Sequence, residues 1–318
     1  MLDNYPIDTQ SLEKHYGVKG KTLQRYYKNS LSEYHTWEQK EHAENYLLFP
    51  DNLGSFLSID ETALSNGELY TILTNKVKGG KKGSIVAIVK GTKAHDVIRV
   101  IRRIPLSKRN EVKEITLDMA ASMNLIAEKC FHKATRVTDR FHVQKLASEA
   151  VQEIRIKHRW EALEEENKGS KVNTFENGDS RKQLLARSRF LLFKSSSKWT
   201  TSQILRAKLL FNEYPDIEKA YKLSMELTSI YEHTKIKNIA LTKMAQWFNK
   251  VEESQFDSFK TIKGTFHKHY QYILNYFDRR STNASAESFN AKIKNFRRAF
   301  RGVRDLKFFL FRIAKIFA

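Results

Sequence analysis

The sequence predicts an α/β protein with a mixed sheet, a large all-helical insertion and a short helical segment ahead of the sheet. Apolar runs rich in strand formers come first, and helical patterns then alternate with two further strand patterns. From about residue 141 to 277 the apolar spacing is helical throughout. With 318 residues, of which 41% are hydrophobic, the chain is long enough for one domain with an insertion.

The N-terminal residues 9–28 predict two short helices. The apolar pattern indicates a helix that ends at Tyr16, a turn at Gly17 and a second helix from about Lys21. This spacing is typical of a helix-turn-helix, and it fits an ordinary helical hairpin equally well. If the segment binds DNA, its basic contact residues are expected to be Lys21, Arg25 and Lys28.

The strand-rich block predicts the topology of the sheet. Strands are expected at 55–60, 69–74, 84–89, 114–118 and 134–139, with helices at 95–103 and 120–131. No helix fits between the first three strands, so they should pair as an antiparallel meander. The order of three strands, helix, strand, helix and strand is that of a ribonuclease H-like fold, whereas a Rossmann fold alternates strand and helix from the start.

The rest of the chain completes a map of four parts. The helical middle is expected to break at Pro215 and at Gly264, and a further helical stretch follows it. The parts are a helix-turn-helix-like segment, the first part of the sheet domain, the all-helical insertion and the last part of the sheet domain, at 1–50, 51–150, 151–275 and 276–318.

The charge of the chain points to a polyanionic partner. Lys and Arg number 56 against 36 Asp and Glu, which gives a formal net charge of +20. Nucleic acid is the leading candidate; a ribosome or a membrane surface, or solubility alone, is the alternative. The single cysteine, Cys130, excludes a disulfide framework and a cysteine-based zinc cluster. Neither a signal peptide nor a transmembrane stretch is visible, so we expect a cytoplasmic, nucleoid-associated protein of a prokaryote.

Three acidic residues predict a metal site. The first and fourth strands, which are neighbours in a ribonuclease H-like sheet, end in Asp60 and Asp118. Two carboxylates held together repel each other, and a divalent cation such as Mg²⁺ or Mn²⁺ relieves that repulsion. A third acid should come from a helix packed over the site, and Glu287 fits because it shares a helix face with Asn290 and Lys294.

Each of these acids also has an ordinary structural interpretation, since an aspartate that ends a strand often caps the next helix. Asp139 ends a strand too, and we interpret it as such a cap in preference to a metal ligand. Glu61 should point to the opposite side of the strand from Asp60. The stretch from Glu287 to the C-terminus holds nine Lys and Arg and two acids, and its expected DNA contacts are Asn290, Lys294, Arg297, Arg298 and Arg301.

Several segments in order resemble the insertion-sequence transposases of the ISL3 group, over about residues 55–318. The segments that carry the resemblance are Leu57-Ser-Ile-Asp-Glu61, Leu117-Asp-Met-Ala120, Asp139-Arg-Phe-His-Val143, Thr282-Asn-Ala-Ser-Ala-Glu-Ser-Phe-Asn-Ala-Lys-Ile-Lys294 and Arg301-Gly-Val-Arg304. The resemblance implies a DDE transposase whose triad maps onto Asp60, Asp118 and Glu287, with two Mg²⁺ or Mn²⁺ ions that support strand cleavage and strand transfer.

The resemblance also implies partners and rivals. The partners would be double-stranded DNA, at the transposon ends and at the target, and further copies in a homodimer or higher oligomer. Members of the group usually carry a zinc-binding segment ahead of the helix-turn-helix, and this chain has no cysteines there, so a separately encoded end-binding protein is a possible partner. The alternatives are a structure-selective nuclease with the same acids and an inactive, transposase-derived DNA-binding protein.

Overall fold

The computed structural model describes residues 1–65, 67–168, 174–300 and 303–318, and the chain falls into two compact units. Residues 1–139 and 281–318 form the first unit, and residues 140–280 form the second. The finer division into four parts stays a prediction. Arg301, one of the expected DNA contacts, lies outside the described residues.

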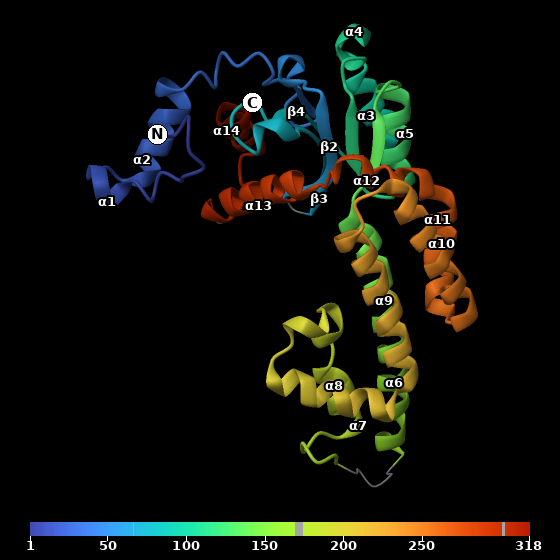
Figure 1. The fold of residues 1–318 in the computed structure, drawn as a ribbon. Helices are drawn as coiled ribbons and strands as arrows, with labels where there is room; N and C mark the ends of the chain where they lie inside the picture. The colour runs from blue at the N-terminus through green and yellow to red at the C-terminus, as the bar shows by residue number, and fades with distance from the viewer. Residues whose placement is uncertain (66, 169–173, 301–302) are drawn as a thin grey trace. The chain divides into compact units, whose positions relative to one another are not determined.

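The first unit is built on a mixed sheet, which has six strands within the described residues (Figure 1). Its order is β1-β4-β3-β2-β5-β6, and its strands are β1 (Tyr46–Leu48), β2 (Phe56–Ser65), β3 (Glu68–Asn75), β4 (Ile85–Lys90), β5 (Glu114–Leu117) and β6 (Thr135–Thr138). Strands β2, β3 and β4 form the predicted antiparallel meander, and β1, which was not predicted, pairs antiparallel with β4. Strand β2 pairs parallel with β5, and β5 with β6. The mixed α/β class and the adjacency of the first and fourth predicted strands are confirmed.

Alternating side chains give the sheet two buried faces. Leu57 and Ile59 of β2 join a core with α3 (Ala94–Ile101) and α5 (Ala121–Cys130). Leu64, on the opposite face, joins a second core with α13 (Ala284–Ala299) and α14 (Leu306–Phe317). The short helix α4 (Leu106–Arg109) precedes β5. The first unit is therefore a three-layer arrangement, with helices on both sides of the sheet (Figure 1).

Helix α13 lies on the sheet through the apolar face that the sequence predicts. Phe289, Ile293 and Phe296 recur at helical spacing and are between 0 and 1% exposed. They pack in the same core as Phe309 and Ile313 of α14. Since the apolar face is fixed against the sheet, the polar residues beside that face have defined positions relative to β2.

The N-terminal segment packs against the C-terminal helix of the same unit. Helix α1 (Glu13–Tyr16) ends at Gly17, whose φ of 65° is left-handed, and α2 (Gly20–Tyr26) runs into a π-helical turn (Tyr27–Leu31). Apolar residues of the segment, Leu2, Leu12 and Tyr27, form one cluster with Phe308 and Phe311 of α14. The guanidinium of Arg312, 1% exposed, donates to the carbonyl of Ile7 at 3.1 Å.

The named elements of the second unit are all helices within the described residues. They are α6 (Arg140–Asn167), α7 (Arg181–Arg187), α8 (Thr201–Glu213), α9 (Pro215–His233), α10 (Lys237–Ser254), α11 (Asp257–Leu274) and α12 (Tyr276–Arg279), with 3₁₀ turns at Leu191–Phe193 and Ser196–Lys198. The capping boxes Ser180 with Gln183 and Thr200 with Gln203 begin α7 and α8. Trp247 is fully buried and donates to the carbonyl of Leu223.

One of the two predicted breaks in this unit is wrong. Pro215 begins α9, where a proline at the first helical position is favourable. Gly264, in contrast, lies inside α11, which continues to Leu274. A glycine costs a helix about 1 kcal/mol relative to alanine. The burial of Phe259, Ile262 and Phe266 on the same helix outweighs that cost.

Candidate metal site and nucleic-acid surface

Asp60 lies on β2, and Asp118 directly follows the end of the neighbouring parallel strand β5. The register pairs Ser58 with Thr116, and each aspartate lies two residues further along the chain. Side chains two residues apart project to the same face of a strand, so Asp60 projects toward the α13 side, on which Ser58 bonds to Asn283. Asp118 follows the last residue of β5, and its carboxylate accepts a hydrogen bond from the Ala120 backbone N–H at 2.9 Å.

The expectation that Asp60 ends its strand is wrong. Strand β2 continues to Ser65, and Asp60 is paired there with Ile72 of β3. The parallel pairing with β5 does stop at Ser58 and Thr116, because β5 ends at Leu117. Asp60 is therefore within a strand but beside the end of a neighbouring one, and its half-buried carboxylate lies beyond the last pair of the parallel ladder.

Two asparagines attach α13 to β2. Asn283, fully buried just ahead of the helix, accepts a hydrogen bond from the Ser58 hydroxyl at 2.9 Å, and its amide lies 3.4 Å from the carbonyl oxygen of Ile59. Asn290 donates from its side-chain amide to Asp60 Oδ2 at 2.6 Å. These residues lie four before and three after Glu287, so all three share one helix face. Glu287 is thus held on the side of α13 that contacts β2.

The sequence interpretation missed the positioning role of these asparagines. Asn290 was expected to contact DNA, yet it is 6% exposed and its amide is bonded to Asp60. Asn283 carried a weak signal, since asparagine is favoured immediately before a helix. In the structure, however, its side chain makes no cap bond and contacts the strand instead.

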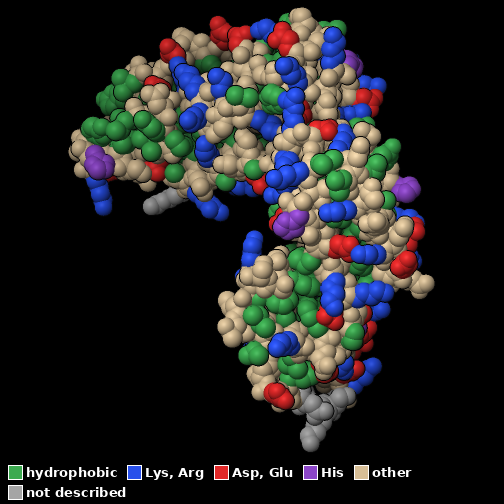
Figure 2. Space-filling model, in the orientation of Figure 1, with side chains coloured by type: hydrophobic (Ala, Val, Ile, Leu, Met, Phe, Trp, Pro, Cys, Tyr) green, Lys and Arg blue, Asp and Glu red, His purple; other side chains and the backbone are tan. Residues whose placement is uncertain are grey.

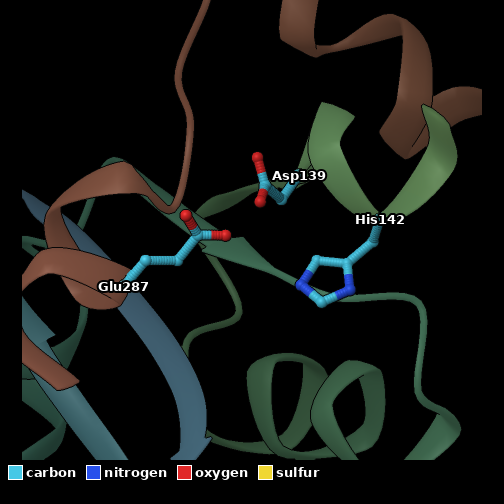
Figure 3. Close-up of side chains that lie close together, drawn as sticks. All are labelled: Asp139, His142 and Glu287. Carbon is cyan, nitrogen blue, oxygen red and sulfur yellow. The ribbon is translucent and has the colours of Figure 1, made fainter. Parts of the chain in front are cut away.

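Asp139 and Glu287 bring their carboxylates together. One oxygen of each lies within 4.8 Å of the other, and Figure 3 shows the two groups facing each other. Asp139 is 1% exposed, whereas Glu287 is exposed. Figure 3 also labels His142, which lies three residues after Asp139 in the first turn of α6.

Asp139 does not cap α6. Neither of its carboxylate oxygens accepts a hydrogen bond from any residue that the structure describes. A capping aspartate accepts from a backbone N–H of the first helical turn, so the interpretation of Asp139 as a cap is wrong.

Burial and neighbouring charges shift the pKa of two side chains near these acids. Burial, then the charge of Asp118 and then that of Asp60, raises the pKa of Glu61, so the three carboxylates lie within electrostatic reach of one another. Burial lowers the pKa of Lys76, which donates to Thr116 Oγ1 at 2.7 Å and pairs with Glu114 at 3.5 Å. No sequence pattern pointed to Lys76, because it follows a strand that carries no other charged residue of this site.

The basic residues expected to bind DNA are found in different environments. Lys and Arg side chains are spread over the visible faces of both units (Figure 2). The exposed ones are Lys21, Arg25, Lys294 and Arg298. Lys28 is paired with Asp305 and lies 5.2 Å from the ring centre of Tyr34, and the guanidinium of Arg297 lies 3.4 Å from the carbonyl oxygen of Ala63.

The α/β unit holds several acids near the ends of β5 and β6, and the whole chain is strongly basic. This combination is typical of enzymes that act on DNA. Comparison with known families bears this out, because a model of transposases matches residues 57–313, which is most of the chain. The chain belongs to the DDE transposases of the ISL3 type, a family of insertion-sequence transposases. No curated protein and no solved structure matches it. No helix among the described residues is both long and apolar enough to cross a membrane.

Proposed function

We propose that this transposase cleaves DNA strands and joins the freed 3′-hydroxyl ends to a second duplex, with Asp60, Asp118 and Glu287 as its catalytic acids. The attachment of α13 to β2 carries the proposal. Asn283 and Asn290 hold the helix at two points of the strand that bears Asp60, and Glu287 lies between them on the same helix face.

The topology of the sheet supports a ribonuclease H-like fold. Strands β4, β3 and β2 form an antiparallel meander, and β5 and β6 continue the sheet in parallel on the other side of β2. This is the order that the sequence predicts for such a domain, with β1 as an additional strand at the edge. The helices of residues 140–280 enter the chain between β6 and α13, which fits an insertion between the second and third acids.

The residues of the site fit a divalent cation. Asp60, Asp118 and Glu287 offer hard oxygen ligands of the kind that Mg²⁺ and Mn²⁺ prefer. Asp60 accepts hydrogen bonds from Asn290 and from the Glu61 backbone at 2.8 Å, and these bonds orient its carboxylate. Two such ions, when bound, activate an attacking hydroxyl and stabilise the leaving oxygen. The part of the chain itself is to position the scissile phosphate and to supply positive charge around it.

Exposed cations supply candidates for the phosphate contacts. Lys294 and Arg298 lie on α13, about two and three helical turns beyond Glu287, and would hold DNA beside the acids. Lys21 and Arg25 of α2 would contact DNA if the N-terminal segment acts as a helix-turn-helix. The proposal includes action as a homodimer or higher oligomer on DNA, help from a separately encoded end-binding protein, and residence at the nucleoid of a prokaryotic cell.

Asp118→Asn tests the assignment. The amide keeps the shape of the side chain but loses the charge that a cation needs, so metal-dependent cleavage should fall at least about 100-fold while DNA binding is retained. Asp51→Asn, a change of the same kind at an exposed site of the same unit, is the control and should cut like the wild type. Cleavage at the wild-type rate by Asp118→Asn would refute the mechanism. Cleavage without joining by the wild type would make the chain a nuclease.

A further inference from the structure

Asp139 occupies the third position in a row of aspartates across the sheet. The parallel register pairs Leu117 with Thr138, and the Asp139 backbone N–H donates to the carbonyl of Leu117 at 2.9 Å. Asp118 and Asp139 directly follow this last pair, so they lie beside each other at the ends of β5 and β6. Asp60 on β2, Asp118 after β5 and Asp139 after β6 therefore follow one another across the sheet.

No described residue supplies a hydrogen-bond partner for the Asp139 carboxylate. Its carboxylate is 1% exposed, and neither oxygen has a hydrogen-bond partner in the described part of the chain. Burial of an unpaired carboxylate is costly, and proteins meet that cost with a paired charge, a hydrogen bond or a metal ion. Lys76 acts on Asp139 only through its charge, since its ammonium bonds to Thr116 and Glu114.

Glu287 supplies the second half of a cation site. Its carboxylate faces that of Asp139, with an oxygen of each within 4.8 Å (Figure 3). Two oxygens on one octahedral Mg²⁺ stand about 3 to 4.2 Å apart, from metal–oxygen bonds of about 2.1 Å. The upper limit of 4.8 Å lies close to this range, and the exposed Glu287 side chain can adjust to a cation while the buried Asp139 stays in place.

We propose that Asp139 is a fourth carboxylate ligand of the site and that it shares one divalent cation directly with Glu287. This inference rests on the proposed function, because the cation is one of those that the transposase uses. It adds a residue that the acidic triad does not contain. It also explains why a carboxylate without a hydrogen-bond partner is buried beside a helix that carries another acid.

The test measures Mn²⁺ binding to the full chain. Electron paramagnetic resonance gives the concentration of the ion that remains free. Asp139→Asn should weaken one Mn²⁺ site at least about 10-fold, and Glu287→Gln should weaken the same site. The double variant should weaken this same site and leave any other Mn²⁺ site as it is in the wild type, because both residues bind the same ion. Asp51→Asn is the control and should bind as the wild type.

A thermal melt separates a ligand from a structural aspartate. In EDTA, Asp139→Asn should melt at or above the wild-type temperature, because it removes a buried carboxylate that has no hydrogen-bond partner among the described residues. It should also lose most of the rise that Mn²⁺ gives the wild type. Wild-type Mn²⁺ binding by Asp139→Asn, or weakening of two different Mn²⁺ sites by Asp139→Asn and Glu287→Gln, would overturn this inference and leave the triad standing. A wild-type chain that binds no Mn²⁺ would overturn the inference and the proposed function together.

Discussion

Asn283 is a buried residue that fixes the position of Glu287 relative to β2. It is fully buried beside the start of α13, and it connects that helix to β2 through Ser58 and the carbonyl of Ile59. The backbone N–H of Glu287 donates to the carbonyl of Asn283 at 2.9 Å, so the two residues belong to one turn. Asn283→Ala removes the side-chain contacts and leaves this backbone bond.

The expected loss follows from the buried groups. A lost side-chain hydrogen bond costs about 1 kcal/mol, and a buried hydroxyl left without its acceptor costs about 1–3 kcal/mol more. Asn283→Ala should therefore lower the free energy of unfolding of the first unit by roughly 2–4 kcal/mol, and Ser58→Ala added to it should cost less than the sum of the two changes. This loss corresponds to about 30- to 700-fold faster exchange of amides that open by unfolding of the unit.

Hydrogen exchange of the β2 and α13 amides in the full chain measures this loss within the first unit. Asn295→Ala is the matched control, because Asn295 is exposed on the same helix and its loss should stay within about 0.5 kcal/mol. Mn²⁺ affinity should fall together with the protection of α13. Unchanged protection in Asn283→Ala would show that α13 is not held by this residue, and the reasoning that places Glu287 would fail.

Three further outcomes are expected. Lys294→Ala should weaken binding to all DNA sequences alike and should reduce the slope of log affinity against log salt by about one, whereas an unchanged slope would remove Lys294 from the DNA surface. Burial raises the pKa of the Cys130 thiol to about 11, which lowers its thiolate fraction at pH 8 roughly 100-fold from the ordinary value. Alkylation of Cys130 should therefore be slow until the chain unfolds. Rapid alkylation of the native protein would contradict this. Arg312→Met should release the N-terminal segment from α14 and speed its cleavage by trypsin without loss of protection in β2.

Most of the sheet unit was predicted from two sequence patterns, the alternating pattern of β2 and the helical pattern of α13. A period of two or of 3.6 residues is a local property, so strands and helices were found close to their expected bounds. Strand β1 was missed because its three residues are too few to show a period. The extent of β2 beyond Asp60 depends on pairing with β3 alone, which local composition does not reveal.

The candidate site was only partly predictable for the same reason. Residue type pointed to Asp60, Asp118 and Glu287, since carboxylates in these elements fit a divalent cation. The partners of a side chain are properties of the folded unit. From the sequence, Asn290 is interpreted as a DNA contact, but in the structure its amide bonds to Asp60. Asp139 is interpreted as a helix cap, but in the structure its carboxylate makes no cap bond with any described residue.

Mapping the cuts made in the DNA that flanks this transposase's own gene tests the central claim most directly. With Mg²⁺, the wild-type chain should cut at defined positions at the ends of the element, and EDTA should abolish these cuts. Glu287→Gln should bind the same DNA and leave it intact, whereas Glu111→Gln, at an exposed site of the same unit, should cut like the wild type. Cuts by Glu287→Gln at the wild-type rate, or cuts that persist in EDTA, would contradict a metal-dependent mechanism built on these acids.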